Sequence, residues 1–551
     1  MPPPGEVFGS ALPSAYGVAV ILEFGARQEL QLLALLVSAA GLLILAGPLR
    51  IPYPILLVVG GLLLGFAPGV PAVTMPPQLV LVGILPPLLY VSAYSTGLRE
   101  LRHNLRPISL LALGVVAATT AGVAVVAHEV VGIGWAEAFV LGAVVSPTDP
   151  IAATAIGRRL GVPRRLIDIV EGESLVNDGT ALVLLRTALL AAVTGAFSVW
   201  SAGWDLVVTI LGGIAVGLAV GYVVRRVRRP LDNPPLEVTI AFLTGYFAFL
   251  PASALDVSGV LAVVTAGVYM GWYTPELTTV ETRLQGRAFW DILTFLLNVL
   301  LFGLVGLQLR PILDSLSGRG TSTLLTDVVV VVLAVIAVRI VGVFAATYVP
   351  RVLSRRIRER DPYPPWTYPA FISWNGMRGA VTIAAALLVP LTTDAGTPFP
   401  DRDLIVFLAF CVVLATLVVQ GLSLPAVIRA LRLEADDGGA EAEDAMARVR
   451  AAEAALARLD ELVREDWVLD DTAERLRGAY RFRIDRFSAR TDPDGDGKIE
   501  KRSLKYQKLR RELLDAERRA VVELRNTGEI SDDVMRRVEH DLDLEVSRLD
   551  N

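Results

Sequence analysis

Four oxygen-bearing side chains share one helical face within an otherwise apolar region. In the segment EGESLVNDG at 171–179, Ser174 precedes Asn177 by three residues and Asp178 by four, and Glu173 precedes Asn177 by four. Side chains three or four residues apart are neighbours on a helix. Carboxylate, hydroxyl and amide oxygens suit a hard monovalent cation, and the segment offers no thiolate or imidazole ligand. We therefore predict a cation site here, with Asp178 as the group that titrates.

A proline-flanked acid interrupts a second apolar stretch. In SPTDP at 146–150, Asp149 lies between Pro147 and Pro150. Proline removes an amide donor and disfavours helical geometry at the residue before it, so an unbroken helix is excluded. Unwound backbone at membrane depth is tolerated only where it lines a cavity or is buried in protein, and its free carbonyls can bind cations. We expect Asp149 to face an ion path.

Two arginines supply the expected counter-charges. Arg339 lies in the middle of VLAVIAVRIVGVFAATY, and Arg378 lies between two glycines in SWNGMRGAVTIAAALL. A charge at the centre of a membrane span costs at least about 2.5–3.5 kcal/mol. A buried arginine stays protonated and requires a carboxylate, so Glu173 and Asp149 are the expected mates. The sequence leaves open which arginine pairs with which carboxylate, and Arg339 has the alternative of reaching an interface.

The composition requires that these residues sit in a membrane. Of the 551 residues, 53% are hydrophobic and 19% are charged, which excludes a soluble enzyme of ordinary composition. A bilayer core of about 30 Å needs about 20 apolar residues per helix. This criterion predicts thirteen spans: 29–48, 52–67, 77–95, 106–127, 134–157, 171–194, 203–224, 236–253, 258–273, 288–309, 325–348, 367–390 and 403–425.

The loop charges predict the orientation. Residues 1–430 hold 27 Arg and no Lys, and the loops between the predicted spans carry 20 of these arginines on one side and four on the other. Because basic loops stay cytoplasmic, we expect an external N-terminal segment at 1–28, a transmembrane domain at 29–430 and a cytoplasmic C-terminus.

The last part of the chain has a different composition. Residues 431–551 are rich in Ala, Glu, Arg and Leu with helical periodicity, which predicts a cytoplasmic helical domain. The segment 492–503 has Asp492, Asp494 and Asp496 at positions of a calcium loop, but Ser503 stands where a bidentate Glu is required. A turn between helices and a weak regulatory calcium site both stay open.

Four motifs give the chain a family resemblance. They are LPPLLY at 85–90, SPTDP at 146–150, EGESLVNDG at 171–179 and NGMRGAV at 375–381. Together they resemble the monovalent cation:proton antiporter-1 family, which includes bacterial sodium/proton antiporters and the sodium/proton exchangers. The resemblance implies an all-α polytopic membrane protein with inverted repeats and two crossing broken helices. It also implies a homodimer and an elevator-type movement of a core domain.

The same resemblance implies a role for each polar residue. Asp178 is similar to the carboxylate that binds cation and proton in turn, with Thr148 and Ser174 as further Na+ ligands. Asn177 stands where electrogenic relatives carry a second aspartate, which is similar to the electroneutral branch that exchanges one cation for one proton. A charge network that holds the broken helices is implied for four residues: Asp149, Glu173, Arg378 and Arg339.

The expected function is secondary transport in the cell membrane, inner or plasma, and not enzyme catalysis. Transported Na+ and H+ are the expected ligands, and no cofactor is predicted. The sequence contains no GxxxxGK[ST] loop for a nucleotide, and the acidic tail argues against nucleic-acid binding. Three alternatives stay open: a K+/H+ antiporter of the same fold, a cation channel, and a sensor whose output is the tail.

Overall fold

The computed structural model describes residues 41, 44, 52–67, 77–194, 199–316, 320–393, 397–433, 437–489 and 498–549. The chain forms two compact units, Met1–Glu434 and Ala435–Asn551. The described residues form helices, with one isolated β-bridge between Thr392 and Pro398. The segment 1–28, nearly all of the predicted span 29–48, and residues 492–497 of the calcium-like loop lie outside the described residues.

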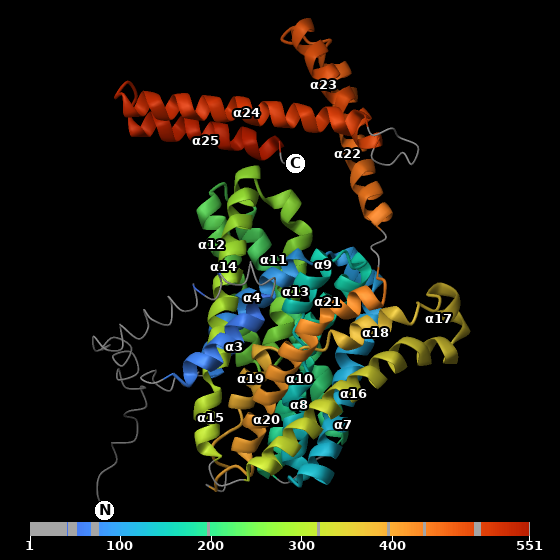
Figure 1. The fold of residues 1–551 in the computed structure, drawn as a ribbon. Helices are drawn as coiled ribbons and strands as arrows, with labels where there is room; N and C mark the ends of the chain where they lie inside the picture. The colour runs from blue at the N-terminus through green and yellow to red at the C-terminus, as the bar shows by residue number, and fades with distance from the viewer. Residues whose placement is uncertain are drawn as a thin grey trace, which may run out of the picture. The chain divides into compact units, whose positions relative to one another are not determined.

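The first unit contains the apolar helices (Figure 1). In chain order they are α3 (Tyr53–Gly65), η1 (Leu79–Ile84), α4 (Leu85–Ser95), α5 (Leu98–His103), α6 (Leu105–Ser109), η2 (Leu110–Val115), α7 (Val116–Val126), η3 (Ala127–Val131), α8 (Trp135–Val145), α9 (Ile151–Arg159), α10 (Arg164–Thr194), α11 (Val199–Arg228), α12 (Pro234–Ala254), α13 (Gly259–Leu277), α14 (Val280–Leu307), α15 (Leu309–Ser315), α16 (Thr321–Leu353), α17 (Arg355–Arg360), α18 (Thr367–Trp374), α19 (Ala380–Leu387), α20 (Arg402–Ala415), η4 (Thr416–Gln420) and α21 (Gly421–Ala430). The label η marks a π-helical stretch that continues its neighbour.

Each predicted span after the first overlaps one of these helices or a run of adjoining ones. Within the described residues, 7 helices are long and apolar enough to cross a membrane, and three shorter apolar helices accompany them: Tyr53–Gly65, Leu79–Ser95 and Trp135–Val145. The all-helical membrane architecture is therefore confirmed. The total of thirteen spans stays a prediction.

Two helices begin well before the predicted spans. α10 begins at Arg164 and α14 at Val280, whereas the spans were predicted from 171 and 288. Charged residues in the first turns lower the local hydropathy, but a helix continues beyond the apolar layer wherever its amides find partners. Thr279 provides such a partner, because its Oγ1 accepts from the Thr282 amide at 3.3 Å.

Two spans are broken at their centres. α8 ends at Val145 and α9 begins at Ile151, and the unwound residues between them include both prolines. Likewise, α18 ends at Trp374 and α19 begins at Ala380, on either side of the unwound segment 375–379. The four half-helices present free amide or carbonyl ends in the interior of the unit.

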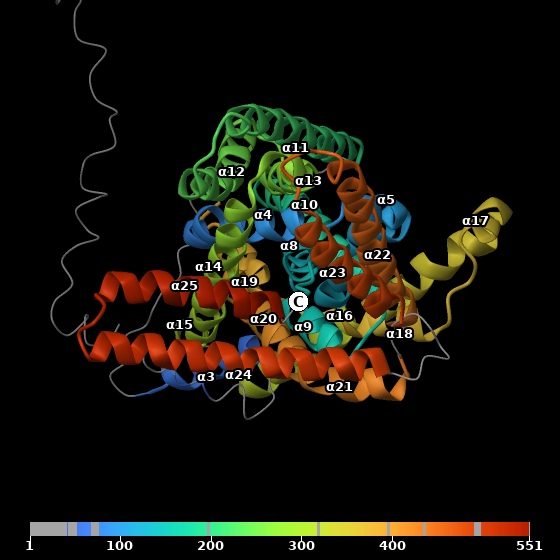
Figure 2. The same ribbon diagram turned by 90° about the horizontal axis from the view of Figure 1, so that it is seen from above.

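Two hydrophobic clusters organise the first unit. The larger cluster joins α3, α7, α8, α10, α14, α16, α19 and α20, and the smaller one joins α4, α11, α12 and α13. A minor third cluster links α4 and α13 to α10. Helix α14 contacts both α4 and α19, and α10 contacts α13, so these helices lie where the two groups meet. Figures 1 and 2 show α11, α12 and α13 together at one edge, and α8, α10 and α19 in the middle.

The second unit contains α22 (Asp437–Leu462), α23 (Asp470–Ser488), α24 (Lys498–Asn526) and α25 (Asp532–Leu549). α22 packs against α23, and α24 against α25, as an antiparallel pair in Figures 1 and 2. Leu514 and Leu542 are buried between the latter two helices, and the ion pair Arg518–Asp543 links them. This unit is thus a set of charged helices with small apolar contacts.

Glycines allow α3 and α14 to cross at close range. A Cβ atom added at Gly61 would lie 2.7 Å from the carbonyl oxygen of Gly303, and one added at Gly306 would lie 2.8 Å from the Gly61 Cα atom. Backbone atoms cannot rotate away as a flexible side chain does. The crossing places Tyr53 and Asn298 together, where Asn298 Nδ2 donates to Tyr53 Oη at 3.4 Å.

We expect Gly306→Ala to lower the unfolding free energy by about 1–3 kcal/mol, because the added methyl group overpacks the crossing. The measurement is thermal unfolding of the purified protein in detergent. Gly303→Ala is the matched control, since it lies on the same helix and its added Cβ meets nothing within 4 Å. Equal stability of the two variants would contradict the close crossing.

Candidate cation site

The two broken helices cross at their unwound segments. The Asp149 amide donates to the Met377 carbonyl oxygen at 2.8 Å. Arg378 Nε donates to the carbonyl oxygen of Val145, the last residue of α8, at 3.0 Å. Each unwound segment therefore supplies hydrogen-bond partners for polar backbone groups of the other. These contacts replace the water that is missing from the apolar layer of a membrane.

The pair Arg339–Glu173 holds the helices around this crossing. Arg339 Nη1 lies 2.7 Å from Glu173 Oε1, and Nη2 lies 3.1 Å from Oε2. Both residues are buried, and Nη2 also donates to the Ile372 carbonyl oxygen at 3.2 Å. The contact is bidentate, the strong geometry for an arginine with a carboxylate. It joins α16, α10 and α18, and it settles one of the pairings that the sequence left open.

Arg378 departs from the expectation that each buried arginine has a carboxylate mate. Within the described residues it forms no ion pair, although its side chain is fully buried. Its guanidinium donates instead to the carbonyl oxygens of Val145 and Gly376. Val145 ends a half-helix, whose carbonyl end carries partial negative charge. Backbone dipoles thus replace the carboxylate that we expected for Arg378.

Asp149 is likewise held by backbone groups. Its Oδ1 accepts from the amide of Ile151, the first residue of α9, at 2.9 Å. A Cβ atom added at Gly379 would collide with the Asp149 carboxylate, so this carboxylate lies directly against the start of α19. Helix amino ends carry partial positive charge and favour an anion. The negative charge of Asp149 therefore offsets the partial positive charge at the amino ends of α9 and α19.

A chain of hydrogen bonds links the remaining polar residues. Asn177 Nδ2 donates to the Thr148 hydroxyl at 2.9 Å and to the Thr148 carbonyl oxygen at 3.2 Å. The Thr148 hydroxyl donates to Glu173 Oε1 at 3.4 Å. Asn177 and Glu173 belong to α10, so this chain fixes α10 against the break in the α8–α9 span. Asn177 here acts as an anchor for the unwound backbone.

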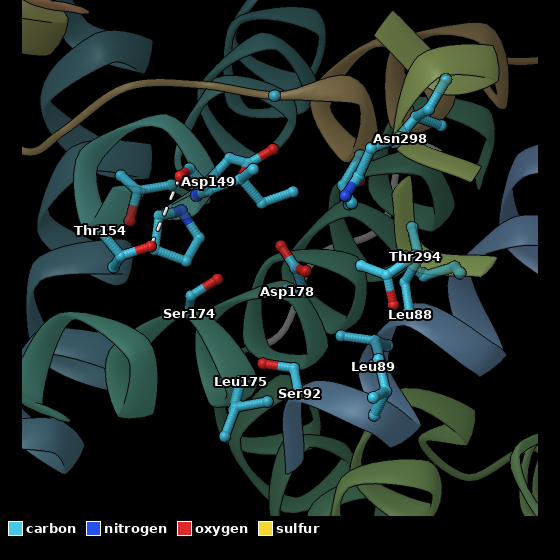
Figure 3. A pocket seen from close by; sticks show the side chains of 18 of the residues that line it. Leu88, Leu89, Ser92, Asp149, Thr154, Ser174, Leu175, Asp178, Thr294 and Asn298 are labelled. Carbon is cyan, nitrogen blue, oxygen red and sulfur yellow. Dashed lines mark hydrogen bonds between the residues drawn. The ribbon is translucent and has the colours of Figure 1, made fainter. Parts of the chain in front are cut away.

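Asp178 lies in a cavity of about 470 Å³ that reaches the place where the two helix groups meet. Its side chain is buried but for 6%, and within the described residues no hydrogen bond or ion pair reaches its carboxylate. Thr148, Asp149 and Ser174 line the same cavity. Figure 3 shows Asp178 and Ser174 directed into one space, with Asp149 beside them. The carboxylate and hydroxyl oxygens that surround this space can bind a monovalent cation.

α14 contributes a polar wall that the sequence analysis missed. Asp291, Thr294 and Asn298 line the cavity, and Figure 3 shows the last two across it from Asp178. Their spacing of three and four residues places them on one face of the helix. This spacing was a readable signal, because no other polar residues occur in the stretch 288–307.

Comparisons with known proteins agree with this geometry. The family described as "Sodium/hydrogen exchanger, transmembrane" matches residues 32–430. A Mycobacterium tuberculosis protein named as an uncharacterized Na+/H+ exchanger is 38% identical over 504 residues, which cover 91% of this chain and 92% of the relative. The Na+/H+ antiporter ApNhaP of Aphanothece halophytica is 30% identical over 492 residues, which cover 88% and 90%. The sodium proton antiporter MjNhaP1 of Methanocaldococcus jannaschii has a similar fold, with a TM-score of 0.57 and 19% identity over 74% of this chain and 98% of that chain.

The fold and the oxygen-lined cavity define a secondary transporter of the membrane. The chain belongs to the sodium/hydrogen exchanger family. It is therefore a multi-pass membrane antiporter and not an enzyme, as the motifs predicted.

We expect Arg339→Gln to lower the unfolding free energy by about 3–5 kcal/mol, because Glu173 is left buried without its partner. The double variant Glu173→Gln/Arg339→Gln should lose less than the sum of the single variants. The measurement is thermal or denaturant unfolding in detergent.

Arg186→Gln is the matched control for this pair. It breaks an exposed ion pair with Asp256, whose side chains are 56% and 80% exposed, so we expect a loss below about 1 kcal/mol. If Arg339→Gln behaves like Arg186→Gln, the buried pair does not hold the crossing together.

Proposed function

We propose that the protein exchanges Na+ for H+ by binding the two ions in turn at Asp178. One observation carries the proposal: within the described residues, Asp178 presents a carboxylate without a protein partner to the cavity. Glu173 is held by Arg339, and Asp149 accepts from the Ile151 amide. A carboxylate that is free on the protein side can accept either a cation or a proton from the cavity.

Competition between the two ions couples their transport. An uncompensated carboxylate is costly to move through a low-dielectric layer, whereas one that holds a cation or a proton is neutral. We infer that the helices carrying Asp178 change access only when Asp178 is occupied. The cavity separates α10 from α14, since residues of both helices line it, and this space supports an elevator-type movement of α10 relative to α14.

Ser174 and Thr148 complete the proposed Na+ site. Both line the cavity with Asp178, and Ser174 lies one helical turn before it on α10. Asn177 supports the site indirectly, because it holds the Thr148 backbone. Oxygen ligands alone do not separate Na+ from Li+ or K+, so the K+/H+ alternative is tested by the cation that drives exchange.

We further propose an electroneutral exchange of one cation for one proton. Glu173 is held in the ion pair with Arg339, and Asp149 Oδ1 accepts from the Ile151 amide, so these contacts leave Asp178 as the carboxylate available to the transported ions. Only Asp178 then changes its proton occupancy. Homodimer assembly, the external N-terminus and the cytoplasmic position of residues 431–551 stay predictions.

We expect Asp178→Asn to abolish exchange, because an amide neither titrates nor balances the charge of a cation. The measurement is proton movement in everted vesicles after addition of Na+, Li+ or K+. Asp256→Asn is the control, since Asp256 is exposed and its φ of 58° suits asparagine. Exchange retained by a correctly folded Asp178→Asn variant would overturn the site.

The stoichiometry is tested in proteoliposomes with a clamped membrane potential. We expect the rate of Na+/H+ exchange to be unchanged when the potential is set to either sign, because one charge moves in each direction. Exchange driven by the potential alone would show that a second group carries a charge. Currents at channel rates would instead support the cation-channel alternative.

A further inference from the structure

A second cavity, of about 430 Å³, lies among α4, α11, α12, α13 and α14. We call it the basic cavity, because Arg228, Arg283 and Arg287 line it. It adjoins the Asp178 cavity, since Ser95, Trp290 and other residues line both. The proposed exchange does not use these arginines, so they require another explanation.

Arg228 is the anchor of the basic cavity. It is 2% exposed, and its Nη2 lies 3.2 Å from Glu237 Oε2. Its Nε and Nη1 have no partner within the described residues. Glu237 is fully buried and also accepts from the Thr282 hydroxyl at 3.3 Å. Buried guanidinium groups normally use their donors, so two unused ones beside a cavity indicate a ligand that accepts hydrogen bonds.

α14 adds further positive charge to the same space. Arg283 and Arg287 lie four residues apart near its amino end, and both are exposed toward solvent. The partial positive charge of the helix start adds to theirs. Thr278 and Thr282 also line the cavity, with their hydroxyl groups donating to the Thr274 carbonyl oxygen and to Glu237. Asp291 is the acid of the lining, at the end shared with the Asp178 cavity. Three arginines against Asp291 and Glu237, the partner of Arg228, leave one net positive charge at the cavity.

We propose that the basic cavity binds the phosphate group of an anionic ligand. Planar guanidinium donors match the oxygens of a phosphate monoester or diester, and several arginines together balance its charge. Such a group comes either from an anionic lipid headgroup or from a soluble phosphate compound. The site does not depend on the role proposed for Asp178.

The test uses the full-length protein and two probes. In neutral detergent, the thermal unfolding midpoint is measured with inorganic phosphate against chloride at equal ionic strength. In nanodiscs, it is measured in phosphatidylcholine with and without phosphatidylglycerol. We expect at least one probe to raise the midpoint. Inorganic phosphate alone indicates a soluble ligand, and phosphatidylglycerol alone indicates a headgroup.

Variants separate the site from general charge effects. Arg283→Gln/Arg287→Gln should weaken binding roughly tenfold or more, because two charge-assisted contacts are lost. Arg228→Lys keeps a positive charge beside Glu237 but removes the planar donors, so it should also weaken binding. Arg229→Gln is the control, since Arg229 is exposed beside Arg228 and does not line the cavity.

Three results would overturn the proposal. The first is that neither probe shifts the midpoint of the wild-type protein. The second is that the double variant at 283 and 287 responds like the wild type. The third is that Arg229→Gln loses the response to the same extent, which would assign the effect to surface charge.

Discussion

Compensation of buried charge is the constraint on which the rest of this structure depends. The crossing of the broken helices brings two carboxylates and two arginines into a region where an isolated charge is costly. In the bidentate Arg339–Glu173 contact, one arginine and one carboxylate neutralise each other. The carbonyl and amide ends of half-helices compensate the other two charges, Arg378 and Asp149. A straight helix offers no such ends in its middle, so the breaks are part of the charge balance.

Asp178 differs from these four charged residues in its surroundings. Within the described residues, the other four charged groups at the crossing have hydrogen-bond partners in the protein: Glu173, Arg339, Arg378 and Asp149. Asp178 lies one helical turn after Ser174 on α10 and faces the cavity, and no protein group within the described residues bonds to its carboxylate. In the proposed function, the ion that enters the cavity balances its charge. A site of this kind responds to the ions on whichever side has access.

The cavity is shared between two structural groups, which explains why one helix alone could not define it. Asp178 and Ser174 of α10 line one side of it, whereas Thr294 and Asn298 of α14 lie across from them (Figure 3). The tight α3–α14 crossing keeps the opposite wall rigid. The elevator-type movement that we propose changes the surroundings of Asp178 without breaking the Arg339–Glu173 pair, because α16 and α10 belong to the same hydrophobic cluster.

The membrane location, nearly all described spans and the eight polar residues that the structure brings together could be predicted from the sequence alone. These features are local: apolar length sets a span, and side chains three or four residues apart must share a helical face. Pro147 and Pro150 also dictated an interruption, because proline lacks an amide and restricts its predecessor.

Tertiary structure decided the partners. Residues from 173 and 339 meet only after the chain has folded, so no local pattern could pair them. Arg378 and Asp149 contact the carbonyl and amide ends of half-helices. The residue types alone do not show where in the fold these ends lie. The wall formed by Thr294 and Asn298, and the pair Arg228–Glu237, likewise depend on which helix faces which. Long-range packing selects among contacts that the sequence only makes possible.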